Sequence, residues 1–320
     1  MNVPPRSSVR DLDAVVAGVS VVDVIGRPVN LRRPVKAGSL QSIDSITMTT
    51  GGNVPNVGID LAKLGFRVGA VTRVGHDTFG GFLRSQLEMH GIVSGGLILD
   101  EGGQTSSTIV GVDTSGERTF FHTRGCMSNF RVEDLLAHID VVRRGRILLF
   151  GYYGLLPECD RHLGRLFRAI HQKTGIPVLL DTAGSPRRDD RLLASFMPHV
   201  DYFLPSYDEA SAITGETDPA RIAGALVAAG APGVVGVKLG ADGVYVHWKG
   251  KGKRIPSRKV RRVVDATGAG DAFVAGFTAG LLRGADPFAA AKLGNAVAAS
   301  SLSAVGASTA IGDVSEYIQP

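Results

Sequence analysis

The sequence predicts an α/β protein with a mostly parallel central sheet, and three observations carry this prediction. From residue 146 onward, short apolar runs alternate with helical stretches, as in parallel strands joined by helical crossovers. The first half contains two β-prone segments, residues 27–50 and 105–123, that interrupt the alternation. The chain has 320 residues, 44% hydrophobic and 20% charged, which is enough to bury a large core. Neither an internal repeat nor a linker divides it, so we expect one domain over residues 13–320.

The elements of the first half follow from local patterns. Residues 13–20 form an apolar run that ends in small residues, as a buried first strand would. Residues 27–50 are polar with alternating β-branched side chains, which favours exposed strands outside the main sheet, in the manner of a lid. Residues 54–64 have helical spacing that stops at Gly65, and residues 68–74 give a second buried strand.

A hairpin and a regular series of strands and helices follow. The runs 105–112 and 118–122 flank a turn-rich segment and predict a hairpin that joins the lid. The later elements are expected as strands at 147–150, 178–181, 202–204 and 234–239, helices at 160–173, 208–214 and 219–229, a hairpin around 250–253, a helix through Phe273, Phe277 and Leu281, and a last helix over 287–304.

Charge, cysteines and hydropathy exclude several classes of protein. The net charge of +5 is spread along the chain, which does not favour nucleic-acid binding. Cys126 and Cys159 lie far apart, so neither a disulfide framework nor a zinc cage is expected. Residues 1–12 lack an apolar core and predict a disordered tail rather than a signal peptide. The small-apolar stretch 289–311 is interrupted by polar residues, which argues against a membrane span. We therefore expect a cytoplasmic protein without a membrane partner.

The strongest local signal is the segment Asp265-Ala-Thr-Gly-Ala-Gly-Asp271-Ala-Phe273, at a strand-to-helix junction. Small residues there leave backbone amides at the helix N-terminus free to bind an anion. A carboxylate beside such amides can accept a hydroxyl proton during phosphoryl transfer. A glycine turn followed by a helix-stabilising aspartate explains the same spacing. P-loop, GxGxxG, HExxH and GxSxG motifs are absent from the sequence.

This segment resembles the C-terminal signature of the ribokinase-like carbohydrate kinases, the PfkB family. Other landmarks similar to that family follow its order along residues 13–311: Gly18 with Asp23, the run Gly51-Gly52-Asn53-Val54-Pro55-Asn56, and residues 74–80, 116–118 and 237–243. The resemblance implies a three-layer α/β/α sandwich with a small β-strand lid, and it favours the catalytic interpretation of Asp271.

The resemblance also implies a reaction, the ATP-dependent phosphorylation of a sugar hydroxyl. Asp271 would be the general base, and the amides of Gly268, Ala269 and Gly270 would stabilise the transferred phosphoryl group. Mg²⁺ would bridge the nucleotide phosphates, with Glu209 holding its waters. Lid closure would exclude water from the acceptor site.

The binding residues are carried over position by position. The sugar would contact Asp23, Gly51, Gly52 and Asn56, and Arg124 would contact an acidic sugar. The remaining assignments are Ser206, Glu209, Lys238, Gly240 and Asn295 for ATP, and Asp265 and Thr267, with backbone from 301–310, for a possible potassium ion. Ser206 stands where the family often has Asn, which is expected to alter metal or phosphate affinity rather than abolish activity.

Two rival functions stay open, a nucleoside kinase of the same fold and a non-catalytic sugar-binding regulator. The intact Gly-Ala-Gly-Asp motif argues against the regulator, which needs no base beside an anion site. The basic cluster at 249–262 is expected to be a solvated hairpin rather than a nucleic-acid surface. The lid is expected to serve also as a homodimer surface, because pairing would cover its sheet edges.

Overall fold

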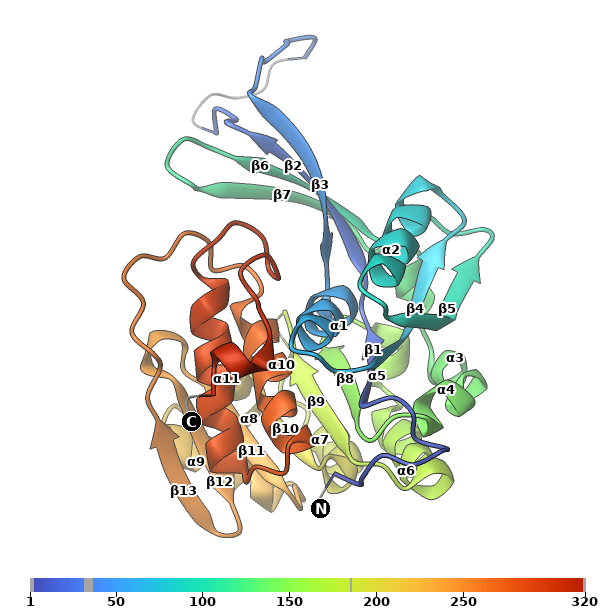
Figure 1. Cartoon of the computed structure of the whole chain (residues 1–320), viewed down its shortest axis with the longest axis vertical. Helices are drawn as coiled ribbons and strands as arrows, with labels where there is room; N and C mark the ends of the chain where they lie inside the picture. The colour runs from blue at the N-terminus through green and yellow to red at the C-terminus, as the bar shows by residue number, and fades with distance from the viewer. Residues whose placement is uncertain (1–2, 32–36, 185, 319–320) are drawn as a thin grey trace.

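The computed structural model describes residues 3–31, 37–184 and 186–318 (Figure 1). Within them, the larger sheet has nine strands in the spatial order β13-β12-β11-β10-β9-β8-β1-β4-β5. All neighbours from β11 to β5 are parallel, and β12 and β13 are antiparallel, so the predicted mostly parallel sheet is confirmed. The strands are β1 (Ala14–Gly18), β4 (Val68–Gly75), β5 (Val93–Asp100), β8 (Leu148–Tyr153), β9 (Val178–Thr182), β10 (Tyr202–Phe203), β11 (Val234–Lys238), β12 (Val244–Trp248) and β13 (Lys251–Ile255).

Helices cover both faces of this sheet. Successive side chains of each strand point to opposite faces, and because the central strands are apolar on both faces, both must be covered. Ala14 and Val16 of β1 pack with α1, α2, α10 and α11, whereas Val15 and Ala17 pack with α3 to α9. The helices are α1 (Asn53–Lys63), α2 (Thr78–Met89), α3 (Val132–Ala137), α4 (Ile139–Arg143), α5 (Pro157–Asp160), α6 (Leu163–Thr174), α7 (Asp190–Phe196), α8 (Tyr207–Thr214), α9 (Pro219–Ala228), α10 (Ala269–Leu282) and α11 (Pro287–Ser301). Short 3₁₀ turns are η1 (Gly125–Asn129), η2 (Met197–His199), η3 (Gly240–Asp242) and η4 (Val314–Glu316). This is the expected three-layer sandwich.

A second sheet projects from one end of the body and forms the lid (Figure 1). Its order is β3-β2-β6-β7, with β2 parallel to β6 and the outer pairs antiparallel. The strands are β2 (Val21–Arg27), β3 (Ser45–Gly51), β6 (Ser107–Val112) and β7 (Arg118–Thr123). The lid begins at Val21 rather than at residue 27. The apolar start of β2 has the composition of a core strand, so the local pattern does not mark where the chain leaves the main sheet.

Most other elements lie where the sequence placed them, and the exceptions are short or weakly patterned. The predicted helix over 160–173 corresponds to α6, which begins at Leu163 after the separate short helix α5, and the helix predicted to 304 ends at Ser301. Sequence patterns did not reveal α2, β5, α3, α4 or α7. Strand β5 includes two glycines and is only partly buried, which removes the apolar signature of a core strand.

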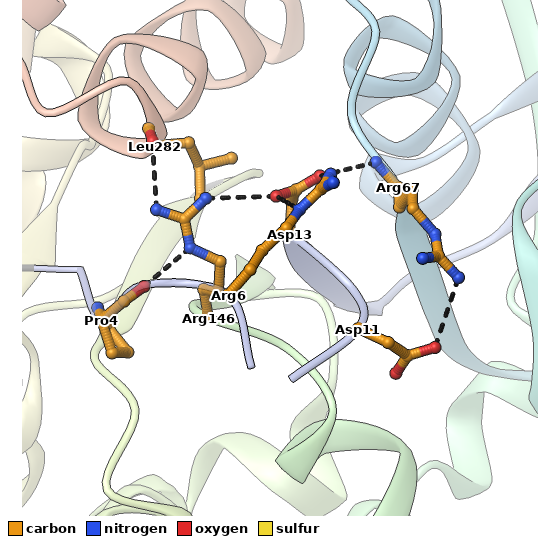
Figure 2. Close-up of polar contacts among 7 residues, drawn as sticks. All are labelled: Pro4, Arg6, Asp11, Asp13, Arg67, Arg146 and Leu282. Carbon is orange, nitrogen blue, oxygen red and sulfur yellow. Dashed lines mark hydrogen bonds and ion pairs between the residues drawn. The ribbon is translucent and has the colours of Figure 1, made fainter. Parts of the chain in front are cut away.

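The N-terminal segment, expected to be a disordered tail, is tied to the body from residue 4 onward (Figure 2). Asp13 is 1% exposed and accepts hydrogen bonds from Arg6, from the Arg67 amide (2.9 Å) and from Arg146 (3.1 Å). Arg146 also donates to the carbonyl oxygen of Pro4 (2.7 Å). No helix of the described ranges is long and apolar enough to cross a bilayer.

Candidate active site

The predicted site residues gather where the carboxyl ends of the central strands meet the N-terminus of α10. Two hollows adjoin there. The lid cavity, about 620 Å³, lies between the inner face of the lid and α10, and the strand-end groove, about 400 Å³, runs past the ends of β9 and β11. Tyr152, Gly268 and Asp271 line both hollows. A group held in one hollow would therefore reach a group held in the other at these residues.

Asp271 lies in the first turn of α10 and is 5% exposed. Its Oδ2 accepts hydrogen bonds from the Tyr152 hydroxyl (2.7 Å) and from Asn56 Nδ2 (2.9 Å). Its Oδ1 has no hydrogen-bond partner among the described residues. Burial raises the pKa of Asp271 above its usual value, while the two hydrogen bonds and the charge of Lys238 oppose this rise. Asp271 thus has one oxygen held by two hydrogen bonds and one oxygen that can accept another hydrogen bond.

The wall opposite Asp271 comes from β2 and the start of α1. Asn56 is placed by the first turn of α1, whose N-cap Gly52 has φ 86° and a backbone that passes close to Val19. A Cβ at Gly52 would lie 2.5 Å from the Val19 carbonyl oxygen, so only glycine fits there. Asp23, Gly51, Gly52 and Asn56 all line the lid cavity. Burial raises the pKa of Asp23, although Thr108 and the neighbouring basic residues His122 and Arg118 oppose this.

The N-terminus of α10 presents its backbone to the groove. Gly268 is the N-cap in a left-handed conformation, with φ 75°. A Cβ there would lie 2.3 Å from the Cβ of Ala307, so the turn requires glycine. Gly268, Ala269 and Gly270 line the groove together with Asp271. The first amides of a helix lack intrahelical partners and carry the positive end of its dipole, so this turn suits an anion.

Two polar clusters line the opposite side of the strand-end groove. Lys238 at the end of β11 donates to Asp181 of β9 at 2.7 Å. Burial raises the pKa of Asp181 to about 6 even though the Lys238 charge lowers it. Glu209 Oε2 accepts hydrogen bonds from the Ser206 hydroxyl (2.6 Å), the Ser206 amide (3.1 Å) and the Thr182 hydroxyl. Ser206 therefore fixes the orientation of Glu209 by capping α8.

Asp265 and Thr267, expected beside a potassium ion, are bound by an arginine from the lid. Arg118 begins β7 and donates to Asp265 Oδ1 at 2.7 Å and to the Thr267 hydroxyl. The Thr267 amide (2.9 Å) and the Gly306 amide (3.1 Å) also donate to this carboxylate. Burial raises the pKa of the Asp265 carboxyl group, but the hydrogen bonds from these donors lower it further, so the pKa lies below its usual value. The positive Arg118 guanidinium, which donates to both side chains, opposes a second cation on the same oxygens.

Two expected residues stay outside both hollows. Arg124 is exposed at the start of η1 and belongs to neither lining, whereas Arg27, Arg118 and Arg262 line the lid cavity. Asn295 is buried and donates to the carbonyl oxygens of Ile255 (3.2 Å) and Pro256 (3.0 Å). Its amide thus connects α11 to the end of β13. Gly240 lines the groove as expected.

Sequence reasoning overlooked Tyr152, Asp181 and Arg118 as site residues. Tyr152 and Asp181 are the next-to-last residues of the neighbouring parallel strands β8 and β9. Polar residues at the carboxyl ends of parallel strands converge on one edge of a sheet, and this rule would have pointed to both. No local signal pairs Arg118 with a residue 147 positions away.

Comparisons with known proteins show the family and the fold that this chain resembles. The pfkB family carbohydrate kinase model matches residues 11–313. A fructokinase of Klebsiella pneumoniae is 34% identical over 243 residues, which cover 72% of this chain and 76% of that protein. The ribokinase structure of Thermotoga maritima is similar with a TM-score of 0.80 and 26% identity, covering 96% of this chain and 98% of that one. An Arabidopsis thaliana ribokinase, solved with ribose and ATP, has a TM-score of 0.79 at 24% identity, covering 96% and 97%. The expected ribokinase-like fold is confirmed.

Proposed function

Since this chain belongs to the pfkB family of carbohydrate kinases, we propose that it transfers the γ-phosphoryl group of ATP to a hydroxyl of a small sugar in the lid cavity. The position of Asp271 carries this proposal. It lies where the two hollows meet, with Oδ2 anchored and Oδ1 without a partner among the described residues. A sugar beneath the lid and a nucleotide along the strand ends would meet there.

Asp271 acts as the general base in this proposal. Tyr152 and Asn56 orient the carboxylate, and Oδ1 accepts the proton of the attacking hydroxyl as the oxygen–phosphorus bond forms. The proton resides on Asp271 while ADP leaves with the electron pair of the broken bond. The raised pKa of Asp271 makes it a stronger base than a solvent-exposed aspartate.

Backbone amides and Lys238 stabilise the negative charge of the transferring group. The turn 268–270 provides the amides of Gly268 and Gly270 at the positive end of α10, whereas the expected Ala269 amide already donates to the Ala266 carbonyl oxygen at 3.3 Å. A Cβ on Gly270 would lie 3.5 Å from Lys238 Nζ, which places the ammonium group beside the same turn. Lys238, Ser206 and Gly240 would then line the path of the nucleotide phosphates.

The groove also suits magnesium, because a hard cation prefers oxygen ligands and keeps several of its waters. Three carboxylates, Asp181, Glu209 and Asp271, line this hollow. The described residues hold no cluster of three His, Cys, Asp or Glu side chains close enough to bind a metal directly. Glu209 would therefore hold the waters of a magnesium ion that is bound mainly by the nucleotide. When bound, the ion neutralises phosphate charge.

The hydrogen-bonding side chains that line the lid cavity suit a polyol. Asp23 can accept two hydroxyl hydrogens, and Asn56 offers a donor and an acceptor. The Gly51 backbone comes close to the Asp23 carboxylate. Both cysteines are free and buried, which supports a reducing cytoplasm as the place of action, where ATP is available.

A nucleoside is the second candidate substrate, and one residue favours it. Phe120 of β7 lines the lid cavity and is 59% exposed, so its ring could stack on a base. A base would have to fit beneath the lid beside Ile25 and Val112, which also line the cavity.

The lid is also proposed as a homodimer surface. Met48, Val24, Ile109 and Phe121 are paired across the four strands in one row. Three of them are exposed, Met48 by 42%, Ile109 by 61% and Phe121 by 68%. The neighbouring register row contains Asp23, Thr49, Thr108 and His122, and its side chains point to the other face of the sheet. Asp23 lines the lid cavity on that face, so the apolar row lies on the outer face. A second copy would cover this apolar face.

Sedimentation tests the dimer. The wild type should sediment as a dimer, Ile109→Lys should dissociate it, and Val227→Lys on α9 is the control that should not. A monomeric wild type contradicts the dimer.

An ADP-release screen tests the function. Purified protein with ATP and Mg²⁺ is assayed against pentoses, ketohexoses, acidic ketosugars, polyols and nucleosides, and calorimetry measures acceptor binding. ADP formed only with a sugar supports a sugar kinase, and ADP formed only with a nucleoside supports the second candidate. Sugar binding without ADP release would support the non-catalytic regulator and contradict both kinase proposals.

A further inference from the structure

The contact between Arg118 and the segment before α10 is the feature that the proposed reaction does not use. Arg118 lies at the first position of β7, opposite Val112 of β6. Its guanidinium reaches across to Asp265 and Thr267, which precede the anion-binding turn. All three residues line the lid cavity. The lid and the turn at Gly268 are therefore connected by one side chain.

The acceptor of this contact is a buried, ionised carboxylate. The Asp265 side chain is 6% exposed, and that of Arg118 is 32% exposed. Asp265 also receives the Thr267 amide on Oδ1 and the Gly306 amide on Oδ2. The carboxylate thus joins Arg118 to two backbone segments, one leading directly to Gly268 and one following α11.

A buried carboxylate needs a positive partner, because desolvation otherwise disfavours its charged form. A guanidinium provides this charge at every physiological pH, and its planar donors suit two acceptors at once. Here those acceptors are Asp265 Oδ1 and the Thr267 hydroxyl. A potassium ion at these two side chains would have to displace Arg118.

We propose that Arg118 takes the place of a monovalent cation beside Asp265, so that this kinase works without potassium and holds its anion-binding turn in position only when the lid is closed. Arg118 is a positioning residue: it acts on the reacting groups through Asp265 and the turn at Gly268. The inference rests on the proposed kinase function and assigns a charge-neutralising role to the lid itself.

The two parts of this role affect different kinetic constants. The lid contact helps to enclose the sugar, so its loss should raise the KM for the sugar. The positive charge beside Asp265 keeps the turn placed for the transferring phosphoryl group, so its loss should lower kcat. Added potassium can replace the charge but not the connection to the lid. It should therefore restore kcat in an Arg118→Ala variant while the sugar KM stays high.

Steady-state kinetics in choline chloride, with and without about 100 mM potassium at matched ionic strength, test this split. Wild-type kcat should change by less than about 1.5-fold, and Arg118→Ala should lose about tenfold in potassium-free kcat, the scale of one charged hydrogen bond. Potassium, or millimolar guanidinium, should recover at least about a third of this loss, and Arg118→Lys should be intermediate. Arg143→Ala removes an exposed arginine from its pair with Asp140 on α4 and should behave as wild type.

Melting temperatures provide a readout that needs no turnover. Potassium should raise the melting temperature of Arg118→Ala more than sodium does and leave that of the wild type unchanged. This result would support the inference even if no sugar or nucleoside were phosphorylated, which separates its failure from failure of the proposed function. Potassium activation of the wild type would overturn the inference. An Arg118→Ala variant that neither potassium nor guanidinium improves would also overturn it, and would leave Arg118 as a lid contact only.

Discussion

Two buried aspartates lie at opposite ends of the parallel strands, Asp13 at their amino ends and Asp271 at their carboxyl ends, and their surroundings differ. Asp13, just before β1, is 1% exposed, and both of its oxygens accept hydrogen bonds from arginines or backbone. Asp271, in the first turn of α10, is 5% exposed and uses only Oδ2. Burial acts to raise both pKa values. The donors around Asp13 lower its pKa below the usual value, whereas the donors around Asp271 do not prevent a rise.

The difference separates a structural carboxylate from one available for chemistry. Asp13 accepts hydrogen bonds from two guanidinium groups and one backbone amide, so its charge stabilises the fold and its proton affinity is low. Asp271 is held by the neutral donors Tyr152 and Asn56, which orient one oxygen and leave the other able to take a proton. Similar solvent exposure thus accompanies opposite roles, and the charge of the donors, together with the deeper burial of Asp271, decides between them.

The largest expected effect is on catalysis at Asp271. Asp271→Asn should lower kcat by about 10²–10⁴-fold, because the amide is nearly isosteric but cannot accept a proton at neutral pH. Binding of ATP and of the sugar should change little, and the variant should be at least as stable as the wild type, since it removes a buried charge. Kinetics at saturating substrates and calorimetric ATP binding measure this. More than about a tenth of wild-type kcat would exclude the general-base role.

The matching change at the other end should affect stability alone. Asp13→Ala leaves Arg146, 13% exposed, without its carboxylate partner, and should lower the free energy of unfolding by about 3 kcal/mol. Urea unfolding measures this loss, and kcat of the folded variant should stay within about twofold of wild type because the change is remote from the chemistry. A loss of kcat with unchanged stability would reverse the assigned roles.

The pH dependence of stability sharpens the same contrast. Because the folded-state pKa of Asp13 is lowered, its contribution is present above the unfolded pKa of about 4 and is lost as pH falls through the folded value. The pKa of Asp271 is raised, so its ionisation costs stability as pH rises from about 4 through the folded value. In a plot of the free energy of unfolding against pH, Asp13→Asn should therefore reduce the loss of stability as pH falls below about 4. Asp271→Asn should remove the loss of stability that accompanies ionisation of Asp271 as pH rises above about 4.

A smaller effect is expected at Tyr152, which tests whether a neutral donor orients Asp271. Tyr152→Phe should lower kcat by about tenfold through loss of one hydrogen bond to a charged group. It should also move the acid limb of the kcat profile to higher pH, because that bond lowers the pKa of Asp271. Tyr153→Phe is the control, since the Tyr153 ring packs against Phe196 in the core. An unshifted acid limb would limit Tyr152 to a packing role.

The smallest effect is expected at Arg124, for which the family resemblance implies a contact with an acidic sugar. Its side chain is exposed and belongs to neither hollow. Arg124→Ala should therefore change the KM for any phosphorylated acceptor by less than about twofold, as for an exposed charge. A tenfold rise in KM for an acidic sugar would instead assign Arg124 to the sugar site.

The fold class and the center of the site could be predicted from the sequence because both depend on local chemistry. Alternating strands and helices require a parallel sheet, and the left-handed turn at Gly268, with φ 75°, favours glycine. Helical spacing after Gly52 places Asn56 in the first turn of α1. These properties are set within a few residues and need no knowledge of the rest of the chain.

Contacts between distant segments were decided only by the tertiary structure. Tyr152 and Asp271 are 119 positions apart, Arg118 and Asp265 are 147 apart, and nothing near either residue specifies its partner. The same holds for Asn295, an expected ATP ligand whose side-chain amide donates instead to backbone carbonyls at the end of β13. The physical reason is that packing of whole elements sets the direction of a side chain and the donors it meets, and these donors make Asp13 structural and leave Asp271 able to accept a proton.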